Sequence, residues 1–372
     1  MRIGIDARLL STKIRGTARY LSNLIEYLPQ FDNQNDYFIF QYEDVSRENE
    51  FYKYIPIKKS KLPRQIYEHY WLNFVLPKLI SESRIDIFFT PYIFVPLFKK
   101  NWKNVITVLD SLTIVCKEYY SFHYRKYLGI LVPPSIKRSD KIITISNSAM
   151  QDIIKYYDVL PEKIQFSHLW IDEKYKPIDL SSNEKKELME KYGLPEKFIL
   201  FVSVLEERKN ITGILKVSDL LLKRGIDIKI VFVGREGFGF NKIANTFKEN
   251  SDRFIHLKDI DDKDLVSIYN LATLFFFPTH YEGFGLPPLE AMQCGLPVMA
   301  SNNSSLPEVV GDGGILGEAD DYEFFADKIA LLLNDKNYYK SLKQKAIKQS
   351  EKFTAENHVT KLVKIFNSFS NK

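Results

Sequence analysis

Two glutamates in one short stretch are the residues of this sequence best suited to bind a ligand. Glu282 and Glu290 lie in the segment YEGFGLPPLEAMQCGLP. The apolar run from Leu274 to Phe277 precedes them and predicts a buried parallel strand. A helix is expected to begin near Leu289, with Glu290 in its first turn, because the prolines before it suit a helix start. The two carboxylates would then flank a strand-to-helix turn at the carboxyl edge of a sheet, where open α/β sheets bind ligands.

The residues of this turn also predict which chemical groups the ligand carries. Free amides at a helix start attract an anion, whereas ionised carboxylates accept hydrogen bonds from hydroxyl groups. Gly283 and Gly285 would let the ligand approach the backbone. A sugar nucleotide has both a phosphate and hydroxyl groups. A capping acid beside a glycine-rich turn is the alternative for these residues.

The string EGFGLPPLEAMQCGLPV resembles the acid-x7-acid signature of the retaining GT-B glycosyltransferases of family 4, whose usual form is EGFGLPxLEAMxxGxPV. The resemblance implies that Glu282 contacts the sugar hydroxyls and positions the anomeric carbon, and that Glu290 binds the ribose hydroxyls. It also implies a donor-binding loop, with amides facing sugar and phosphate, formed by Gly283, Phe284, Gly285 and Leu286.

Two adjacent cations, Arg208 and Lys209, follow a second apolar run, Phe198 to Val204, and precede a helix expected from Ile211 to Lys223. Cations at such an edge suit a diphosphate leaving group, whose negative charge grows as the glycosidic bond breaks. The tripeptide RKN at this place resembles the phosphate clamp of the family, which implies a catalytic and donor-binding role for both cations. A solvated basic turn is the alternative.

Other predicted sheet edges add to the donor site. A first strand from Met1 to Asp6 is followed by a loop with Lys13, Arg15 and Gly16, where a glycine and basic residues suit a diphosphate. The segment GIDARLL and this glycine loop resemble the opening of bacterial mannosyltransferase-type members of the family.

In the second half of the chain, Arg235 ends a strand expected from Ile228 to Val233 and is taken as donor-binding. The resemblance implies that the backbone of Ile260 contacts the base of the donor, as the residue at this position does in the family.

The acceptor side departs from the family pattern. In the family, the edge after the strand Val105 to Leu109 commonly carries a His-Asp pair that faces the acceptor and the reacting carbon, and here Leu109 stands in place of the histidine. Asp110 is therefore predicted as a catalytic group, with capping of the following turn as its alternative role. His123, expected in a neighbouring loop, is a candidate for the missing polar group.

Two motifs with other well-known meanings do not fit their usual context. Residues 234–239 read GREGFG, whose GxxGxG spacing lacks the acid of a dinucleotide site, so NAD binding is rejected. The triplet Asp259-Ile260-Asp261 is a DxD metal signature of the other large glycosyltransferase fold, but its place at a helix start predicts capping. We therefore predict no metal and no cofactor.

Composition limits the class of protein. A chain of 372 residues can form two domains, and a net charge of +5 fits a lysine-rich surface better than nucleic-acid binding. The two cysteines, Cys116 and Cys294, support no disulfide framework, and the chain shows no signal peptide and no membrane-spanning run, which predicts a cytoplasmic protein. The basic and aromatic stretch from Lys53 to Ile80 predicts either contact with the inner face of a membrane or an ordinary amphipathic helix.

The alternation of apolar runs and helical patterns predicts an α/β fold. We expect the GT-B arrangement, two doubly wound Rossmann-like domains facing each other across a cleft. The expected ranges are 1–175 for an acceptor-binding domain, 176–354 for a nucleotide-sugar-binding domain, and 355–372 for a helix that packs back on the first. The polar segment from Pro177 to Lys191 is expected to be a linker plus an exposed helix.

These features lead to one predicted function and two alternatives. The resemblance implies a retaining, metal-independent transfer of a hexose, with mannose from GDP-mannose favoured and UDP-sugars next. The acceptor is expected to be a growing surface polysaccharide or its lipid-linked precursor. The alternatives are a nucleotide-sugar 2-epimerase of the same fold and a non-catalytic sugar-nucleotide binder.

Overall fold

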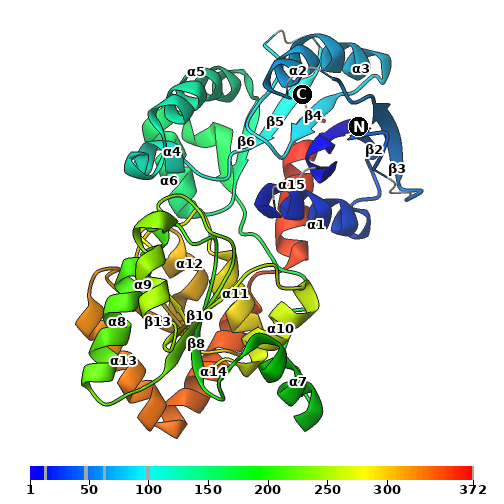
Figure 1. The fold of residues 1–372 in the computed structure, drawn as a ribbon. Helices are drawn as coiled ribbons and strands as arrows, with labels where there is room; N and C mark the ends of the chain where they lie inside the picture. The colour runs from blue at the N-terminus through cyan, green and yellow to red at the C-terminus, as the bar shows by residue number, and fades with distance from the viewer. Residues whose placement is uncertain (12–14, 46–48, 62–63, 98–100, 371–372) are drawn as a thin grey trace. The chain divides into compact units, whose positions relative to one another are not determined.

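The chain forms two compact units, which are seen in the computed structural model of the protein (Figure 1). The structure describes residues 1–11, 15–45, 49–61, 64–97 and 101–370. Unit 1 contains Met1–Leu169 and Thr354–Lys372, and unit 2 contains Trp170–Phe353. The ranges 1–175 for an acceptor-binding domain and 176–354 for a nucleotide-sugar-binding domain stay a prediction.

Unit 1 is built on a parallel sheet of seven strands in the order β3-β2-β1-β4-β5-β6-β7. The strands are β1 (Arg2–Asp6), β2 (Asp36–Tyr42), β3 (Tyr52–Ile57), β4 (Ile87–Thr90), β5 (Lys103–Thr107), β6 (Lys141–Thr144) and β7 (Ile164–Phe166). The direction of winding reverses between β1 and β4, which is the switch point of a doubly wound sheet.

Helices cover both faces of this sheet because its strands are apolar on both sides. On β2, Phe38 and Phe40 pack in a cluster with Leu76, whereas Tyr37 contacts Phe366 with ring centroids 6.5 Å apart. The helices are α1 (Arg15–Phe31), α2 (Arg64–Tyr70), α3 (Leu76–Glu82), α4 (Leu112–Val115), α5 (Phe122–Arg138), α6 (Asn147–Tyr157) and α15 (Ala355–Asn367). Among the described residues, no helix is both long and apolar enough to cross a membrane.

The stretch from Lys53 to Ile80 is not a single amphipathic helix, so that interpretation of the sequence is wrong. Its first part forms β3, an edge strand, where Pro56 is tolerated because one side of the strand needs no hydrogen bonds. The helical part is interrupted by a π turn, Trp71–Val75, in which the Leu76 amide donates to the Trp71 carbonyl. Pro77 follows in the first turn of α3, and the π turn accommodates a residue that has no amide to donate.

Unit 2 is built on a parallel sheet of six strands in the order β10-β9-β8-β11-β12-β13. The strands are β8 (Phe198–Val202), β9 (Lys229–Val233), β10 (Phe254–Leu257), β11 (Leu274–Phe277), β12 (Val298–Ser301) and β13 (Gly314–Gly317). The helices are α7 (Ser182–Tyr192), α8 (Ile211–Lys223), α9 (Ala244–Glu249), α10 (Asp262–Leu271), α11 (Leu286–Gln293), α12 (Leu306–Val310), α13 (Tyr322–Asn334) and α14 (Lys336–Ser350). Winding reverses between β8 and β11, which makes this pair the switch point of unit 2.

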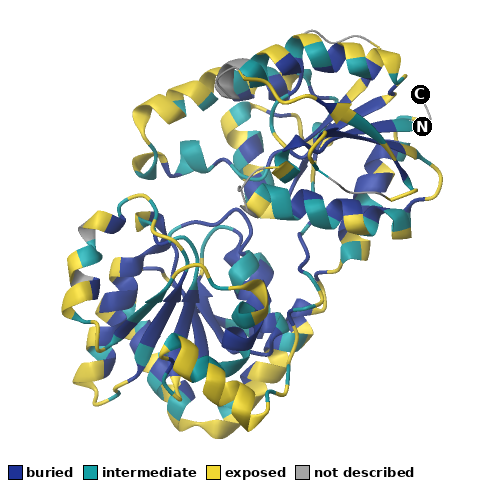
Figure 2. Cartoon of the chain, turned by 45° about the vertical axis from the view of Figure 1, so that its right-hand side comes forward, coloured by how far each residue is buried: buried dark blue, intermediate teal, exposed yellow. Residues whose placement is uncertain are grey.

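The predicted class, α/β with parallel and doubly wound sheets, is confirmed in both units. Figure 2 shows the sheets as largely buried and the outward helix faces as exposed. The helix expected in the polar segment after Pro177 is present as α7, which has no buried residue.

A buried histidine holds the last helix within unit 1. His358 of α15 is 0% exposed, and its Nδ1 lies 3.2 Å from the Ser167 carbonyl and 3.1 Å from the His168 carbonyl. Carbonyl oxygens only accept, so Nδ1 carries the proton and Nε2 accepts from the Tyr20 hydroxyl of α1 at 3.1 Å. Burial lowers the pKa of His358 to about 4, although hydrogen bonds to the two carbonyls oppose this shift.

Acid should therefore weaken the fold of unit 1 through this histidine. Above its ordinary pKa of 6.5, His358 is neutral in the folded and unfolded chain and contributes no pH dependence. Between pH 6.5 and about 4 only the unfolded chain takes up the proton, so the free energy of unfolding should fall by up to about 3 kcal/mol. Urea titrations at several pH values test this.

The His358→Gln variant is the matched control, since glutamine keeps a donor and an acceptor but does not titrate. Its stability should fall less steeply with acid than that of the unaltered protein. Parallel curves for the two proteins would contradict the assignment.

Candidate functional site

Three charged side chains meet at the switch point of unit 2. Arg208 and Lys209 lie in a short 3-10 turn, Glu207–Lys209, after β8, and Glu282 lies in the loop after β11. Lys209 Nζ is 2.5 Å from Glu282 Oε1, and Arg208 Nη1 is 3.4 Å from the same oxygen. All three side chains are buried. The structure thus brings together the two predicted cations and one predicted carboxylate, at the kind of sheet edge where α/β proteins bind ligands.

Backbone contacts fix the turn that carries the cations. The Arg208 guanidinium donates to the Tyr281 carbonyl, and the Arg208 carbonyl accepts from the His280 amide at 3.0 Å. Asn210 adopts a left-handed conformation, and its side chain caps α8 by accepting from the Gly213 amide at 3.0 Å. The loops after β8 and β11 therefore hold each other in place.

The electrostatics of the cluster favour an ionised carboxylate. Burial alone would raise the pKa of Glu282, but the charges of Lys209 and Arg208 outweigh it and hold the pKa below its ordinary value. Burial lowers the pKa of Lys209, and Glu282 opposes this shift while Arg208 adds to it. Glu206 Oε1 lies 2.6 Å from Arg208 Nη2, so two cations face two carboxylates.

Two serines that the sequence did not single out as positioning residues hold the loop after Glu282. The Glu282 amide donates to Ser304 Oγ at 2.9 Å, and the Ser305 hydroxyl lies 3.0 Å from the Glu282 carbonyl and 2.6 Å from the Phe284 carbonyl. Gly285 has φ +110°, and a Cβ there would lie 2.9 Å from a Leu306 methyl group, so glycine is required. In the sequence both serines follow the strand expected from Val298 to Ala300, in a stretch that resembles the family's loop over the donor phosphates, but their contacts with the loop after Glu282 were not predicted.

The second predicted carboxylate, Glu290, lies in α11. This helix begins at Leu286 instead of Leu289, because the prolines occupy its first turn, so the placement of Glu290 in the first turn is wrong. The Tyr269 hydroxyl of α10 donates to Glu290 Oε2 at 2.8 Å, and both side chains are buried. Burial, followed by the charge of Glu290, raises the pKa of Tyr269 well above its ordinary value, so the hydroxyl keeps its proton.

The other predicted donor residues of unit 2 also follow strands of its sheet. Gly283, Phe284 and Leu286 lie in the loop and helix just described, Ile260 is half-buried between β10 and α10, and the exposed Arg235 follows β9. Asp261 is the N-cap residue of α10, but its side chain accepts no helix amide, so the expected capping bond is absent.

The predicted residues of unit 1 lie in or beside helices α1, α4 and α5. Gly16 is exposed in the first turn of α1, whereas Lys13 and the side chain of Arg15 are outside the described residues. Asp110 Oδ1 accepts from the Leu112 amide at 3.1 Å, which is the capping role considered as its alternative. His123 lies exposed in helix α5, so its expected place in a loop is wrong.

Comparisons with known proteins give glycosyltransferase matches in both units. Residues 14–175 match the family model Glycosyltransferase Family 4, and residues 184–349 match the model Glycosyl transferases group 1. The chain is 33% identical over 271 residues to the serotype-specific mannosyltransferase WbdA of Escherichia coli, covering 71% of this chain and 33% of that protein. It is 29% identical over 268 residues to the O-antigen chain mannosyltransferase B of the same species, covering 71% of this chain and 70% of the relative. The chain thus spans about a third of the length of WbdA.

Solved structures share the fold over the whole chain. Sucrose-phosphate synthase from Thermosynechococcus elongatus has a TM-score of 0.76 at 17% identity and covers 100% of both chains. HepE from Anabaena in complex with UDP-glucose has a TM-score of 0.71 at 16% identity, again over 100% of both chains. The chain therefore belongs to the glycosyltransferases of family 4 and group 1, and its two Rossmann-like units are those of the GT-B fold.

Proposed function

We propose that the chain is a glycosyltransferase that moves a hexose from a nucleotide sugar to a saccharide or lipid-linked acceptor in surface polysaccharide synthesis. The observation that carries this proposal is the buried pairing of Arg208 and Lys209 with Glu282 at the switch point of unit 2. Burying two adjacent cations at a sheet edge costs desolvation free energy. Binding of a phosphate-bearing ligand would explain why the cations are placed there. The mannosyltransferase relatives support the same class of reaction.

The proposed mechanism assigns each group of the site one task. Glu282 accepts hydrogen bonds from sugar hydroxyls and positions the anomeric carbon, while Arg208 and Lys209 take up the charge of the departing diphosphate. The acceptor oxygen forms its bond to the anomeric carbon on the face that the diphosphate leaves, and the diphosphate receives the acceptor proton, so the configuration is retained. Because two cations neutralise the leaving group, the proposal needs no metal ion. Asp110 in unit 1 stays a proposed catalytic group on the acceptor side.

The proposed binding of the nucleoside uses Glu290. An ionised carboxylate can accept from both hydroxyls of a ribose, and Tyr269 fixes the carboxylate by donating to Oε2 at 2.8 Å. The backbone near Ile260 would read the base, with Gly16 and Arg235 as further donor contacts. The mannosyltransferase relatives support mannose as the sugar, with GDP-mannose as the proposed donor, and the HepE complex with UDP-glucose supports UDP-sugars as the next candidates.

Two substitutions should separate transition-state stabilisation from donor binding. Lys209→Ala should lower kcat by roughly 100-fold or more, because its partner charge grows only as the bond breaks. Glu290→Ala should mainly raise the KM for the donor. Lys216→Ala, at an exposed position of α8, is the control and should change neither constant.

An unchanged kcat in Lys209→Ala would refute the assignment of that lysine. Product analysis in the same assay tests the reaction class. An epimerase would release free sugar and nucleotide without an acceptor, and a non-catalytic binder would release neither.

The choice of donor has its own test, a thermal-shift panel of GDP-mannose, UDP-glucose, ADP-glucose and dTDP-glucose. A ligand present at about 100 times its Kd stabilises the native state by about 2.7 kcal/mol. GDP-mannose should raise the Tm most. A larger rise with UDP-glucose would replace the proposed donor, and the Glu290→Ala variant should lose most of whichever shift is seen.

We further propose that unit 1 contacts an anionic membrane, where a lipid-linked acceptor would be reached from the cytoplasm. Phe74 in the π turn is 64% exposed and Phe122 of α5 is 68% exposed, although both are large and apolar. The ring centroids of His69 in α2 and Tyr127 in α5 lie 6.2 Å apart, so these two helices contribute to one surface. Helix α5 contains basic residues and no acid. Exposed aromatic rings beside cations suit the interface of an anionic bilayer.

Replacing both Phe74 and Phe122 by serine should reduce cosedimentation with phosphatidylglycerol vesicles several-fold, since apolar contact with the interface is lost. The fold should persist, because both side chains are exposed. Leu331→Ser, at a 46% exposed position in unit 2, is the matched control. Equal sedimentation of all three proteins would rule this contact out.

A further inference from the structure

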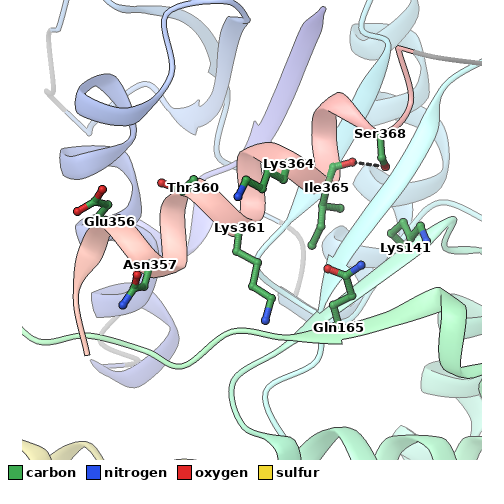
Figure 3. A pocket seen from close by; sticks show the side chains of 9 residues that line it. All are labelled: Lys141, Gln165, Glu356, Asn357, Thr360, Lys361, Lys364, Ile365 and Ser368. Carbon is green, nitrogen blue, oxygen red and sulfur yellow. Dashed lines mark hydrogen bonds between the residues drawn. The ribbon is translucent and has the colours of Figure 1, made fainter. Parts of the chain in front are cut away.

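A groove in unit 1 has a chemistry that the proposed reaction does not use. It is a cavity of about 500 Å³ between α15 and the strands β6 and β7 (Figure 3). Strand β7 is the last strand of the sheet, so the groove lies at its open edge. The side chains that matter here are Lys141, Gln165, Glu356, Asn357, Lys361 and Lys364.

The lining of this groove carries more positive than negative charge. Lys141, Lys361 and Lys364 face it together with one acid, Glu356, which gives three positive charges against one negative charge, a net of +2. Within the part of the chain that the structure describes, no carboxylate oxygen lies within 4.0 Å of the Lys361 or Lys364 ammonium. The Lys141 ammonium donates to a neutral acceptor, the Glu162 carbonyl, at 2.6 Å.

Lys361 is the best-defined of the three cations. It is half-buried, and its Nζ lies 4.6 Å from the centre of the Phe166 ring, which holds the ammonium beside the groove. Burial lowers the pKa of Lys361, which means that keeping this side chain charged in the folded protein costs desolvation free energy. No carboxylate of the described residues offsets that cost at ion-pair distance. A buried charge with a shifted pKa that lines a cavity is a candidate for a binding residue.

We propose that this groove binds a phosphate monoester. A phosphate monoester carries a charge of about −1.5 to −2 near neutral pH and has three strong acceptor oxygens, which matches the net charge of the lining. Lysine ammonium groups bind phosphate as point charges, and the amide side chains of Gln165 and Asn357 can bond to the group that bears the phosphate.

The size of the groove indicates a ligand larger than phosphate itself. Its lining runs from Glu356 of α15 to Ser368, the residue that follows this helix, which is about 18 Å at 1.5 Å per residue. The phosphate could belong to a soluble molecule or to a phospholipid head group. This site is separate from the proposed donor site, whose cations Arg208 and Lys209 belong to unit 2.

Calorimetric titration of the full chain with glycerol 3-phosphate tests the site. The double variant Lys361→Gln with Lys364→Gln should weaken binding at least tenfold, and the corresponding double arginine variant should retain it. Lys155→Gln, an exposed lysine of α6 in the same unit, is the control and should bind like the unaltered protein. Lys209→Ala should also bind normally, which separates this groove from the donor site.

Vesicles identify the source of the phosphate. Phosphatidylcholine vesicles that contain phosphatidic acid present a monoester, and those with an equal amount of phosphatidylglycerol present a diester. If the double glutamine variant loses affinity for glycerol 3-phosphate and for the phosphatidic acid vesicles, but not for the phosphatidylglycerol vesicles, the ligand is a lipid head group. If it loses only glycerol 3-phosphate binding, the ligand is soluble. The proposal is wrong if the unaltered protein does not bind glycerol 3-phosphate, or if a double glutamine variant with an unchanged Tm binds it equally well.

Discussion

The pairing of Lys209 and Arg208 with one oxygen of Glu282 is the interaction on which the site in unit 2 depends. Two buried cations need a carboxylate close by, and this carboxylate comes from a different loop. The cluster can form only if the loops after β8 and β11 end at the same edge of the sheet. The parallel register of these strands, with Leu274 beside Ile199, ensures this. The topology of the sheet therefore determines whether the charges of the site can be balanced.

Hydrogen bonds outside the ion cluster also hold the site in place. Ser304 and Ser305 hold the backbone of the loop after Glu282, and Tyr269 holds one oxygen of Glu290. Asn210 ties the turn of the cations to the Ala319 carbonyl at 2.9 Å. The serine and asparagine contacts each join one loop to another, and the Tyr269 contact joins helices α10 and α11. Side chains held in this way lose little freedom when a ligand arrives, which is the advantage of a preorganised site.

The sequence predicted the parts of this fold that depend on continuous apolar runs. The runs at β8 and β11 were recognised because parallel strands buried on both faces have no polar alternation. Strand β3 was missed because Lys53 and Pro56 interrupt its apolar residues. Both residues are tolerated because β3 lies at the edge of the sheet. The contact of Tyr269 with Glu290 was also missed, since it joins two helices and a tyrosine on an apolar helix face shows no polar partner in the sequence. The cations and acids were found from their types and places after strands, while their roles stay predictions.

Charge balance distinguishes the two lysine-containing sites of this chain. In unit 2, Arg208 and Lys209 face Glu282 and Glu206, so two positive charges meet two negative ones. Stabilising a transition state more than a substrate requires groups that face charge which grows during the reaction, and this is the role proposed for the two cations. In the groove beside α15, three lysines face a single acid, and such an excess favours a charge that the ligand already carries. The role proposed for the first site is catalysis and that for the second is binding, because the charge of a leaving group grows during the reaction whereas a phosphate monoester already carries its charge.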